Sequence, residues 1–336
     1  TVHLNQTIKQ AWMENGSSNN NPNPGYGIQT TTNLGGTLTG ARALGFDTLY
    51  NTTGGSSIKT YNSQNDTWSA LPNTTSNFQR GQAYMTFIRG DRSVTKFNQS
   101  SKPTRIREKD SLNMGDFTIS NLGTFGGQFV SVGNPYASAI SLTNISKTNL
   151  DSTYYLWDPK LGPNTEYGGY QTISVVNGNV TITPGGGSYA PGNKNIESGQ
   201  GFLVRTTTGV GSITFKESNK VNGSYLVARP PLNSNSSFRA NIYRLQNSES
   251  SLVDGVMNIY DSVFSDNVDA VDAIKFKNSM ENIAINQKSG SLLAIDRTAK
   301  LENNDTIFYK LNQLRVSNYQ FEFIPEYLND LGLEAY

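Results

Sequence analysis

Short stretches of alternating apolar and polar residues recur along the whole chain, and clusters of Gly, Pro and Asn separate them. Alternation with a period of two is typical of β-strands with one buried face, and Gly, Pro and Asn mark the turns between strands. In the middle of the chain the pattern predicts strands at residues 128–132, 153–157, 201–204 and 212–215.

The same pattern continues on both sides of this middle block. Ile8, Ala11 and Trp12 belong to an amphipathic start. Strands spaced roughly 8–12 residues apart, with turn signals between them, indicate β-sandwiches. The predicted fold class is therefore all-β, with strand-rich, β-sandwich-like modules in tandem. The further expected strands are 57–61, 67–71, 83–88, 93–97, 117–119, 238–245, 256–260, 283–285, 292–295, 306–311 and 319–324.

The clearest linker is the segment PPLNSNSS at residues 230–237. Its two prolines favour an extended chain, and its Asn/Ser run offers nothing to pack. We therefore expect a strand-rich module at 1–229, with a candidate internal boundary near residue 116, and a smaller β-sandwich at 238–336. The final run Glu334-Ala335-Tyr336 is strand-like without a hairpin partner, so the smaller sandwich is expected to be incomplete at its C-terminal end.

Composition narrows the class of protein. The 336 residues include no cysteine, 17 Tyr and 32 Gly, and the net charge is +1. A charge near zero gives no positive footprint for nucleic acid. No run of 18 apolar residues that could span a membrane is present. We therefore expect neither a nucleic-acid partner nor a transmembrane segment, and the low charge with heavy Asn, Ser and Thr usage favours an exported protein.

Motifs of common catalytic sites are missing from the sequence. G-x-S-x-G, the P-loop and H-E-x-x-H do not occur, and the single histidine, His3, weighs against Ser–His–Asp chemistry. Glycoside hydrolysis needs two carboxylates across a cleft. Asp91, Asp116, Asp158 and Glu166 are available, but the sequence does not place any two at a working separation. We expect no enzymatic activity and no cofactor.

The tripeptide Arg89-Gly90-Asp91 is the one that animal integrins recognise. It ends an apolar run, and Arg92 and Ser93 follow it, where a hairpin turn is expected. Turn chemistry favours a local turn with an Arg–Asp pair. Integrin recognition, which needs an exposed loop tip, is the alternative.

Acidic residues between 254 and 272 could supply oxygen ligands to calcium. They lack the compact D-x-[DN]-x-[DN]-G spacing and the bidentate Glu of a calcium loop. The candidates for a metal site are Asp266, Asp269 and Asp272. A solvated loop with aspartates at strand ends is the favoured interpretation.

The motif GNPYAS at residues 133–138 has distinctive turn chemistry. Pro135 fixes its own φ and biases Asn134 towards extended geometry, so the strand must turn there. Tyr136 can then bury its ring beneath the turn while its hydroxyl binds a backbone partner. We expect these three residues to be folding devices.

Two more motifs of the middle block are also expected to serve the fold. In YYLWDP, residues 154–159, Trp157 is a candidate for a large core anchor. In SGQGFLVR, residues 198–205, Gly199 and Gly201 permit a positive φ or a β-bulge before the strand re-enters a core face.

Several motifs occur in a fixed order along the chain, and together they resemble a known kind of region. GFD at 45–47, SSIKTYN at 56–62 and AYMTFIRGDRSV at 83–94 precede GNPYAS, YYLWDP and SGQGFLVR. In this order they resemble the region before the sorting domain in large Bacteroidetes proteins exported by the type IX secretion system. The tail from 271 to 296, followed by YQFEF, is similar to the small sandwich that comes next in such proteins.

This resemblance implies a secreted or cell-surface protein, such as an adhesin or a protein of gliding motility. Its partners during export would be the type IX outer-membrane translocon or shuttle proteins. The expected function is a non-enzymatic stalk or interaction region. A carbohydrate-binding module for surface glycans, contact with other cell-surface proteins, and cargo held at the translocon are the alternatives.

The resemblance also implies bacterial O-glycosylation at Asp-Ser or Asp-Thr triplets. Such short triplets also arise by chance in a chain rich in Ser and Thr. The candidate acceptors are Thr48, Ser111, Ser152, Ser262 and Thr306.

Overall fold

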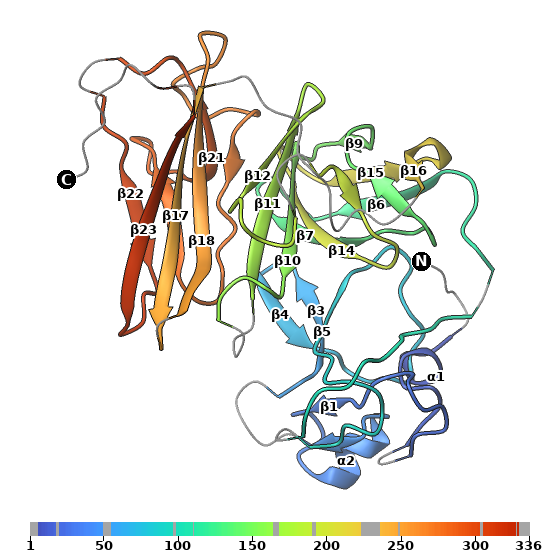
Figure 1. Cartoon of the computed structure of the whole chain (residues 1–336). Helices are drawn as coiled ribbons and strands as arrows, with labels where there is room; N and C mark the ends of the chain where they lie inside the picture. The colour runs from blue at the N-terminus through green and yellow to red at the C-terminus, as the bar shows by residue number, and fades with distance from the viewer. Residues whose placement is uncertain are drawn as a thin grey trace. The chain divides into compact units, whose positions relative to one another are not determined.

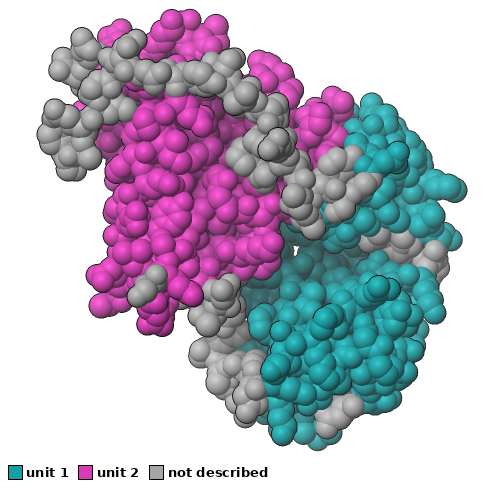
Figure 2. Space-filling model, in the orientation of Figure 1, with its two compact units in different colours: residues 1–140, 145–150, 196–222 teal, residues 141–144, 151–195, 223–336 magenta. Residues whose placement is uncertain are grey.

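A computed structural model of the chain divides into two compact units, which Figure 2 colours separately. Unit 1 comprises Thr1–Ile140, Ile145–Leu150 and Ile196–Asn222, and unit 2 comprises Ser141–Asn144, Asp151–Asn195 and Gly223–Tyr336. The structure describes residues 6–17, 20–49, 55–96, 99–109, 111–163, 168–189, 193–222, 236–247, 249–302, 305–326 and 328.

The predicted all-β fold class is confirmed, because strands make up nearly all of the regular structure (Figure 1). In the part of the chain that the structure describes, helices are limited to α1 (Ile8–Ala11), α2 (Leu38–Ala43) and one 3-10 turn, η1 (Glu217–Asn219). Within the described ranges, none of these is long and apolar enough to cross a bilayer.

The N-terminal part of unit 1 contains a parallel strand pair and a small antiparallel sheet. The parallel pair joins β1 (Thr31–Thr32) to β2 (Thr48–Leu49). The sheet has the order β4-β3-β5, from β3 (Ile58–Asn62), β4 (Thr67–Ala70) and β5 (Tyr84–Thr86). The core beneath them consists of Ile8, Ala11, Phe46, Ile58, Leu71 and Phe78.

The rest of unit 1 is built from longer antiparallel pairs. One pair joins β7 (Phe129–Gly133) to β14 (Gly201–Arg205). Strand β15 (Gly211–Phe215) lies between β6 (Phe117–Leu122) and β9 (Ser146–Thr148). Strand β16 (Lys220–Val221) pairs with β8 (Ala139–Ser141). The chain passes from one unit to the other within β8 and again within β13 (Asn195–Ile196).

Unit 2 begins with an antiparallel meander that the sequence analysis only partly anticipates. Strand β11 (Gly169–Val176) lies between β10 (Thr153–Asp158) and β12 (Asn179–Thr183). Asn177 and Gly178 join β11 to β12 with φ values of 50° and 78°. A two-residue Asn-Gly turn with positive φ matches the right-handed twist of the strands it connects.

The C-terminal strands of unit 2 form one sheet, and side chains from several of these strands make up its hydrophobic core. Its order is β22-β20-β21-β18-β17-β23, with β19 pairing β21 and with β18 and β21 parallel. The core combines Ala240, Ile242, Val253, Val256, Ile283, Ile285 and Leu293. The strands are β17 (Ser236–Gln246), β18 (Glu249–Tyr260), β19 (Ala273–Ile274), β20 (Asn282–Asn286), β21 (Leu292–Thr298), β22 (Tyr309–Asn312) and β23 (Asn318–Glu326).

The bounds of the compact units differ from those of the expected modules. Residues 230–235 of the expected linker lie outside the described residues, and 236–237 already belong to β17. Strands β10 to β12 belong to the same unit as the C-terminal strands, and side chains connect the two groups. The Tyr155 hydroxyl donates to the Ile274 carbonyl at 2.8 Å, and the guanidinium of Arg297 donates to the Ser174 hydroxyl at 3.1 Å.

Candidate functional site

The Arg89-Gly90-Asp91 segment is folded inward at its acidic residue. Asp91 is 7 % exposed, and its carboxylate accepts hydrogen bonds from the amide and hydroxyl of Ser93 at 3.0 and 2.6 Å and from the amide of Gly25 at 2.8 Å. The Ser93 hydroxyl is the largest cause that lowers the pKa of Asp91, to about 2. The exposed loop tip that integrin recognition needs is therefore not present. Residues 93–96 do not form the strand that the sequence predicts there.

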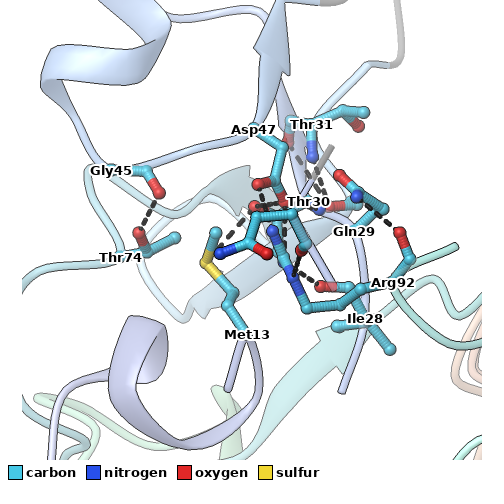
Figure 3. A network of polar contacts seen from close by, with 11 residues as sticks. Met13, Ile28, Gln29, Thr30, Thr31, Gly45, Asp47, Thr74 and Arg92 are labelled. Atoms are coloured by element: carbon cyan, nitrogen blue, oxygen red, sulfur yellow. Dashed lines mark hydrogen bonds and ion pairs between the residues drawn. The ribbon is translucent and has the colours of Figure 1, made fainter. Parts of the chain in front are cut away.

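The next residue, Arg92, is the centre of a buried polar network within unit 1 (Figure 3). Its guanidinium donates to both carboxylate oxygens of Asp47, with Nη2–Oδ1 at 2.7 Å and Nη1–Oδ2 at 3.1 Å. The side chains of Arg92 and Asp47 are 0 % and 1 % exposed. A bidentate pair of this kind satisfies the lone pairs and donors that burial removes from water.

Backbone groups complete the network. Arg92 Nη1 donates to the Ile28 carbonyl at 2.7 Å, and Nε donates to the Asn20 carbonyl at 2.8 Å. Gln29 in turn donates to the Arg92 carbonyl at 2.7 Å. A Cβ atom on Gly16 would lie 2.1 Å from Arg92 Nε, so the guanidinium can pass only because that residue is glycine. The network therefore holds the N-terminal segment of unit 1 in place.

Two of the sequence motifs meet in unit 1 through Asn134. Its amide Nδ2 donates to the carbonyl of Ser138 at 2.9 Å and to that of Glu197 at 3.0 Å, and its Oδ1 accepts from the Tyr136 amide at 3.0 Å. Its backbone amide donates to the Gln200 carbonyl at 3.0 Å. Asn134 therefore ties the turn after Pro135 to the turn before β14.

Tyr136 has the arrangement that its motif predicts. The ring is fully buried, and the hydroxyl lies 2.7 Å from the Gly115 carbonyl and 2.9 Å from the Phe215 carbonyl. Burial raises the pKa of this hydroxyl to about 12. The ammonium of Lys220 lies 4.3 Å from the ring centroid, a cation–π contact.

The two glycines of the SGQGF motif serve different purposes. Gly199 has φ of +72°, the left-handed region expected from the sequence. Gly201 instead permits close packing, because a Cβ atom there would lie 2.5 Å from the Cβ of Ala83. Gly133, opposite Gly201 in the strand pair, donates from its amide to the Gly81 carbonyl at 2.8 Å.

A shallow pocket of about 80 Å³ in unit 1 brings motif residues together with an aromatic cluster. The Trp12 ring packs against Phe78 and Tyr84 with centroid distances of 4.8 and 5.9 Å. Trp12 Nε1 donates to Glu108 at 3.0 Å, and both Trp12 and Tyr84 are half-buried. The pocket is smaller than the roughly 300 Å³ of ordinary ligand sites, so it can hold only part of a ligand against the half-buried rings. The other lining residues are Gln79, Arg80, Gly81, Gln82, Ala83, Asn113, Gly133, Asn134, Pro135, Gly199 and Gly201.

Trp157, expected as a large core anchor, lies only partly within the core. It is only half-buried, and the centroids of its ring and the Tyr170 ring lie 4.9 Å apart, whereas Tyr154, Tyr155 and Leu156 have no exposed surface. The neighbouring Asp158 is fully buried, and it starts a turn by accepting from the Lys160 amide at 2.9 Å. Three consecutive buried positions cannot be inferred from alternation, because this strand is covered on both faces.

The carboxylates of the three calcium candidates accept hydrogen bonds from within unit 2. Asp266 accepts from the Thr298 hydroxyl at 2.8 Å, and Asp269 accepts from the Val271 amide at 2.8 Å. Asp272 accepts from the amides of Asp269 and Arg297 at 2.9 and 2.7 Å. Within the described ranges, no three His, Asp or Glu side chains are arranged to hold a metal ion.

Two of the buried carboxylates of unit 2, Asp254 and Asp296, could not be distinguished from surface acids in the sequence. Asp254 pairs with Lys275 at 2.6 Å, and burial raises its pKa. Asp296 is 6 % exposed and accepts from Asn258 at 2.9 Å. Burial, followed by the charge of Asp272, raises the pKa of Asp296 to about 6. No local sequence signal marks either position.

The glycosylation candidates differ in exposure. Ser111, Ser262 and Thr306 are exposed, and Thr48 and Ser152 are half-buried. Thr48 lies in β2, directly after the buried Asp47.

Comparison with known proteins gives one match. No curated protein and no solved structure matches the chain significantly. A family model described as "Domain of unknown function (DUF8693)" matches residues 45–322, a span that includes Asp47, Arg92 and all three motifs. Because this match covers well over half of the chain, the protein belongs to the DUF8693 family.

Proposed function

We propose that this chain is a non-enzymatic stalk and interaction region of a secreted, adhesin-like protein at the bacterial cell surface, exported by the type IX secretion system. The observation that carries the proposal is that two of the motifs behind the resemblance, GNPYAS and SGQGF, are joined in one structural assembly. Asn134, Tyr136 and Gly199 hold turns and backbone within unit 1. An assembly with fixed turns is rigid, as a spacer region needs to be.

Buried ion pairs support the same role. Arg92–Asp47 in unit 1 and Lys275–Asp254 in unit 2 are nearly inaccessible to solvent. Breaking one partner of a buried pair is strongly destabilising, so each pair fixes one packing of its unit. A region that must keep its shape outside the cell, without disulfides, would benefit from this arrangement.

The export part is tested by cell fractionation. The full-length parent protein is produced in a Bacteroidetes host with an intact or deleted type IX translocon, and surface-exposed protein is labelled. We expect surface labelling only with the intact translocon, and a periplasmic protein serves as the control. Equal surface labelling in both strains would contradict export by this route. Stable co-purification with the translocon in the intact strain would favour the alternative of retained cargo.

Carbohydrate binding is the second candidate, and the aromatic pocket favours it. The half-buried rings of Trp12 and Tyr84 lie beside Gln79, Gln82 and Asn113, whose amides can donate to and accept from sugar hydroxyls. A glycan array with the wild-type protein tests this candidate. Binding abolished by Trp12→Ala and retained by the variant Trp68→Ala, on β4, would support it, and no binding on the array would count against it.

A further inference from the structure

Strand β23 is an edge strand, and two apolar side chains on its core-facing side are exposed to solvent. Among the described strands it pairs with β17 alone, in a register that places Phe321 opposite Ile242 and Phe323 opposite Ala240. Directly opposed residues of an antiparallel pair lie on the same face of the sheet. Since Ala240 and Ile242 belong to the core, Phe321 and Phe323 lie on the core-facing side of β23.

These two phenylalanines are nevertheless exposed. Ala240 and Ile242 have no accessible surface, whereas Phe321 and Phe323 are 40 % and 41 % exposed. The Phe321 and Phe323 rings are nearly parallel at 11°, with centroids 6.3 Å apart, and Phe238 stacks on Phe323 at 5.8 Å. A row of apolar rings therefore extends from the core to the free edge of the sheet, where Figure 1 shows β23 beside β17.

The backbone of β23 suits a further strand on this edge. Proline cannot donate to a ladder, so in sheets it is tolerated where its nitrogen faces away from the neighbouring strand. Pro325 lies opposite Phe238 of β17. By the alternation of the strand, Phe321 and Phe323 then direct their backbone groups to the same free edge as Pro325.

We propose that a second copy of this chain pairs with this edge, with the two β23 strands antiparallel about a two-fold axis at Phe321. In this register Phe321 faces the partner's Phe321, and Tyr319 faces the partner's Phe323. Cross-strand aromatic pairs of this kind stabilise sheets. On the opposite face Gln320 lies beside the partner's Glu322, which pairs an amide donor with a carboxylate.

Side-chain complementarity selects this register over its neighbour. Moving the axis by one residue to Glu322 would place the two Glu322 carboxylates directly opposite each other, and like charges at opposed positions are destabilising. Pairing over residues 318–324 also leaves Pro325 just beyond the ladder. The result is an isologous interface, which closes as a dimer and leaves no further free edge at β23.

Absence of cysteine from the chain makes the register directly testable. A Phe321→Cys variant has one thiol per chain, and in the proposed dimer this thiol faces its own copy within reach of a disulfide. Asn318→Cys is the control, because residue 318 faces the partner's Ile324. The two cysteines of such a dimer would be separated by roughly six strand positions, about 20 Å, which is too far for a disulfide. Mild oxidation and non-reducing electrophoresis are expected to give a covalent dimer for Phe321→Cys and only monomer for Asn318→Cys.

Light scattering of the cysteine-free protein gives an independent measurement. We expect a concentration-dependent mass approaching twice the chain mass of 36.7 kDa. Phe321→Lys should shift the protein to monomer, because it places a charge on the edge. Val263→Lys, at a 79 % exposed position in a loop of unit 2, should dimerise like the wild type. Circular dichroism checks that both variants remain folded.

Three results would overturn the proposal. They are a wild-type protein that stays monomeric at high micromolar concentration, equal dimerisation by folded Phe321→Lys, and equal cross-linking of Phe321→Cys and Asn318→Cys. In the first case, binding of an alternating apolar peptide or of a glycan at Phe321, detected by chemical-shift changes, would assign the edge to a different ligand.

Discussion

Arg92 and Asp47 form a bidentate ion pair in the interior of unit 1, 45 residues apart along the chain. The carboxylate also accepts from the Thr30 amide at 2.8 Å, and the guanidinium binds the Ile28 carbonyl. One ion pair thus connects three separate segments of the N-terminal part. Its loss should affect the folding of unit 1 as a whole.

We expect Arg92→Ala to destabilise the protein by about 3–5 kcal/mol, because it leaves the buried carboxylate of Asp47 without a cation. Asp47→Asn should have a similar effect through the unpaired guanidinium. The measurement is the free energy of unfolding in urea. Arg42→Ala, at an exposed position of α2, is the control and should change it by less than about 0.5 kcal/mol. Equal effects of the two alanine variants would contradict a structural role for the pair.

The lowered pKa of Asp91 gives a stability change in acid. Its folded pKa of about 2 lies below the ordinary value of 3.8, so its contribution is present above pH 4 and is lost as the pH falls towards 2. Asp91→Asn should cost about 1 kcal/mol at pH 7 and progressively less below pH 4. Urea unfolding at several pH values measures this. Ser93→Ala should reproduce part of the loss, since it removes the strongest hydrogen-bond donor to Asp91. A difference in stability between wild type and Asp91→Asn that does not change with pH would contradict the explanation.

Asp296 should have the opposite pH dependence. Its folded pKa of about 6 lies above 3.8, so the folded state holds the proton more tightly, and stability falls as the pH rises from 4 to 6. Asp296→Asn removes the buried charge and should raise the free energy of unfolding by about 1–3 kcal/mol at pH 7, with a smaller gain at pH 4. Thermal unfolding at both pH values, compared with the exposed Asp116→Asn, measures the difference. A gain that does not shrink in acid would disprove the assignment.

Removal of the Tyr136 hydroxyl should destabilise unit 1. Tyr136→Phe keeps the buried ring but deprives the carbonyls of Gly115 and Phe215 of their donor, which costs about 1–3 kcal/mol. Tyr61→Phe is the matched control, because the Tyr61 hydroxyl donates to Asp66 near the surface. We expect the control to lose less than half as much in urea unfolding. Similar losses would show that the Tyr136 hydroxyl has no special role.

Strands whose alternation is long enough could be predicted from the sequence, and short or doubly covered ones could not. Residues 238–245 and 319–324 were expected as strands and lie within β17 and β23. Strands β11 and β12 were missed, although the Asn177-Gly178 turn between them is a strong hairpin signal that could have revealed them. The two-residue strands β1 and β2 exist only through their pairing, which no local pattern indicates.

The candidate sites show the same division between local and distant causes. The burial of Tyr136 followed from Pro135 next to it, because a fixed turn determines where the ring goes. The partner of Arg92 could not be found in this way, since Asp47 is brought to it by the tertiary fold. The partial exposure of Trp157 could not be inferred from the size of its side chain, because the covering of each face of β10 decides it.

The two compact units are interleaved along the sequence, and this constrains how the protein can be made and cut. Unit 1 is complete only after residue 222, and unit 2 takes its first residues from position 141. During synthesis from the N-terminus, unit 1 must therefore wait for β14 and β15, while the chain between them and β9 already belongs to the other unit. No single protease cut separates the two units, and a stop codon before residue 222 leaves both of them incomplete. A chain truncated in this way would expose unsatisfied strands.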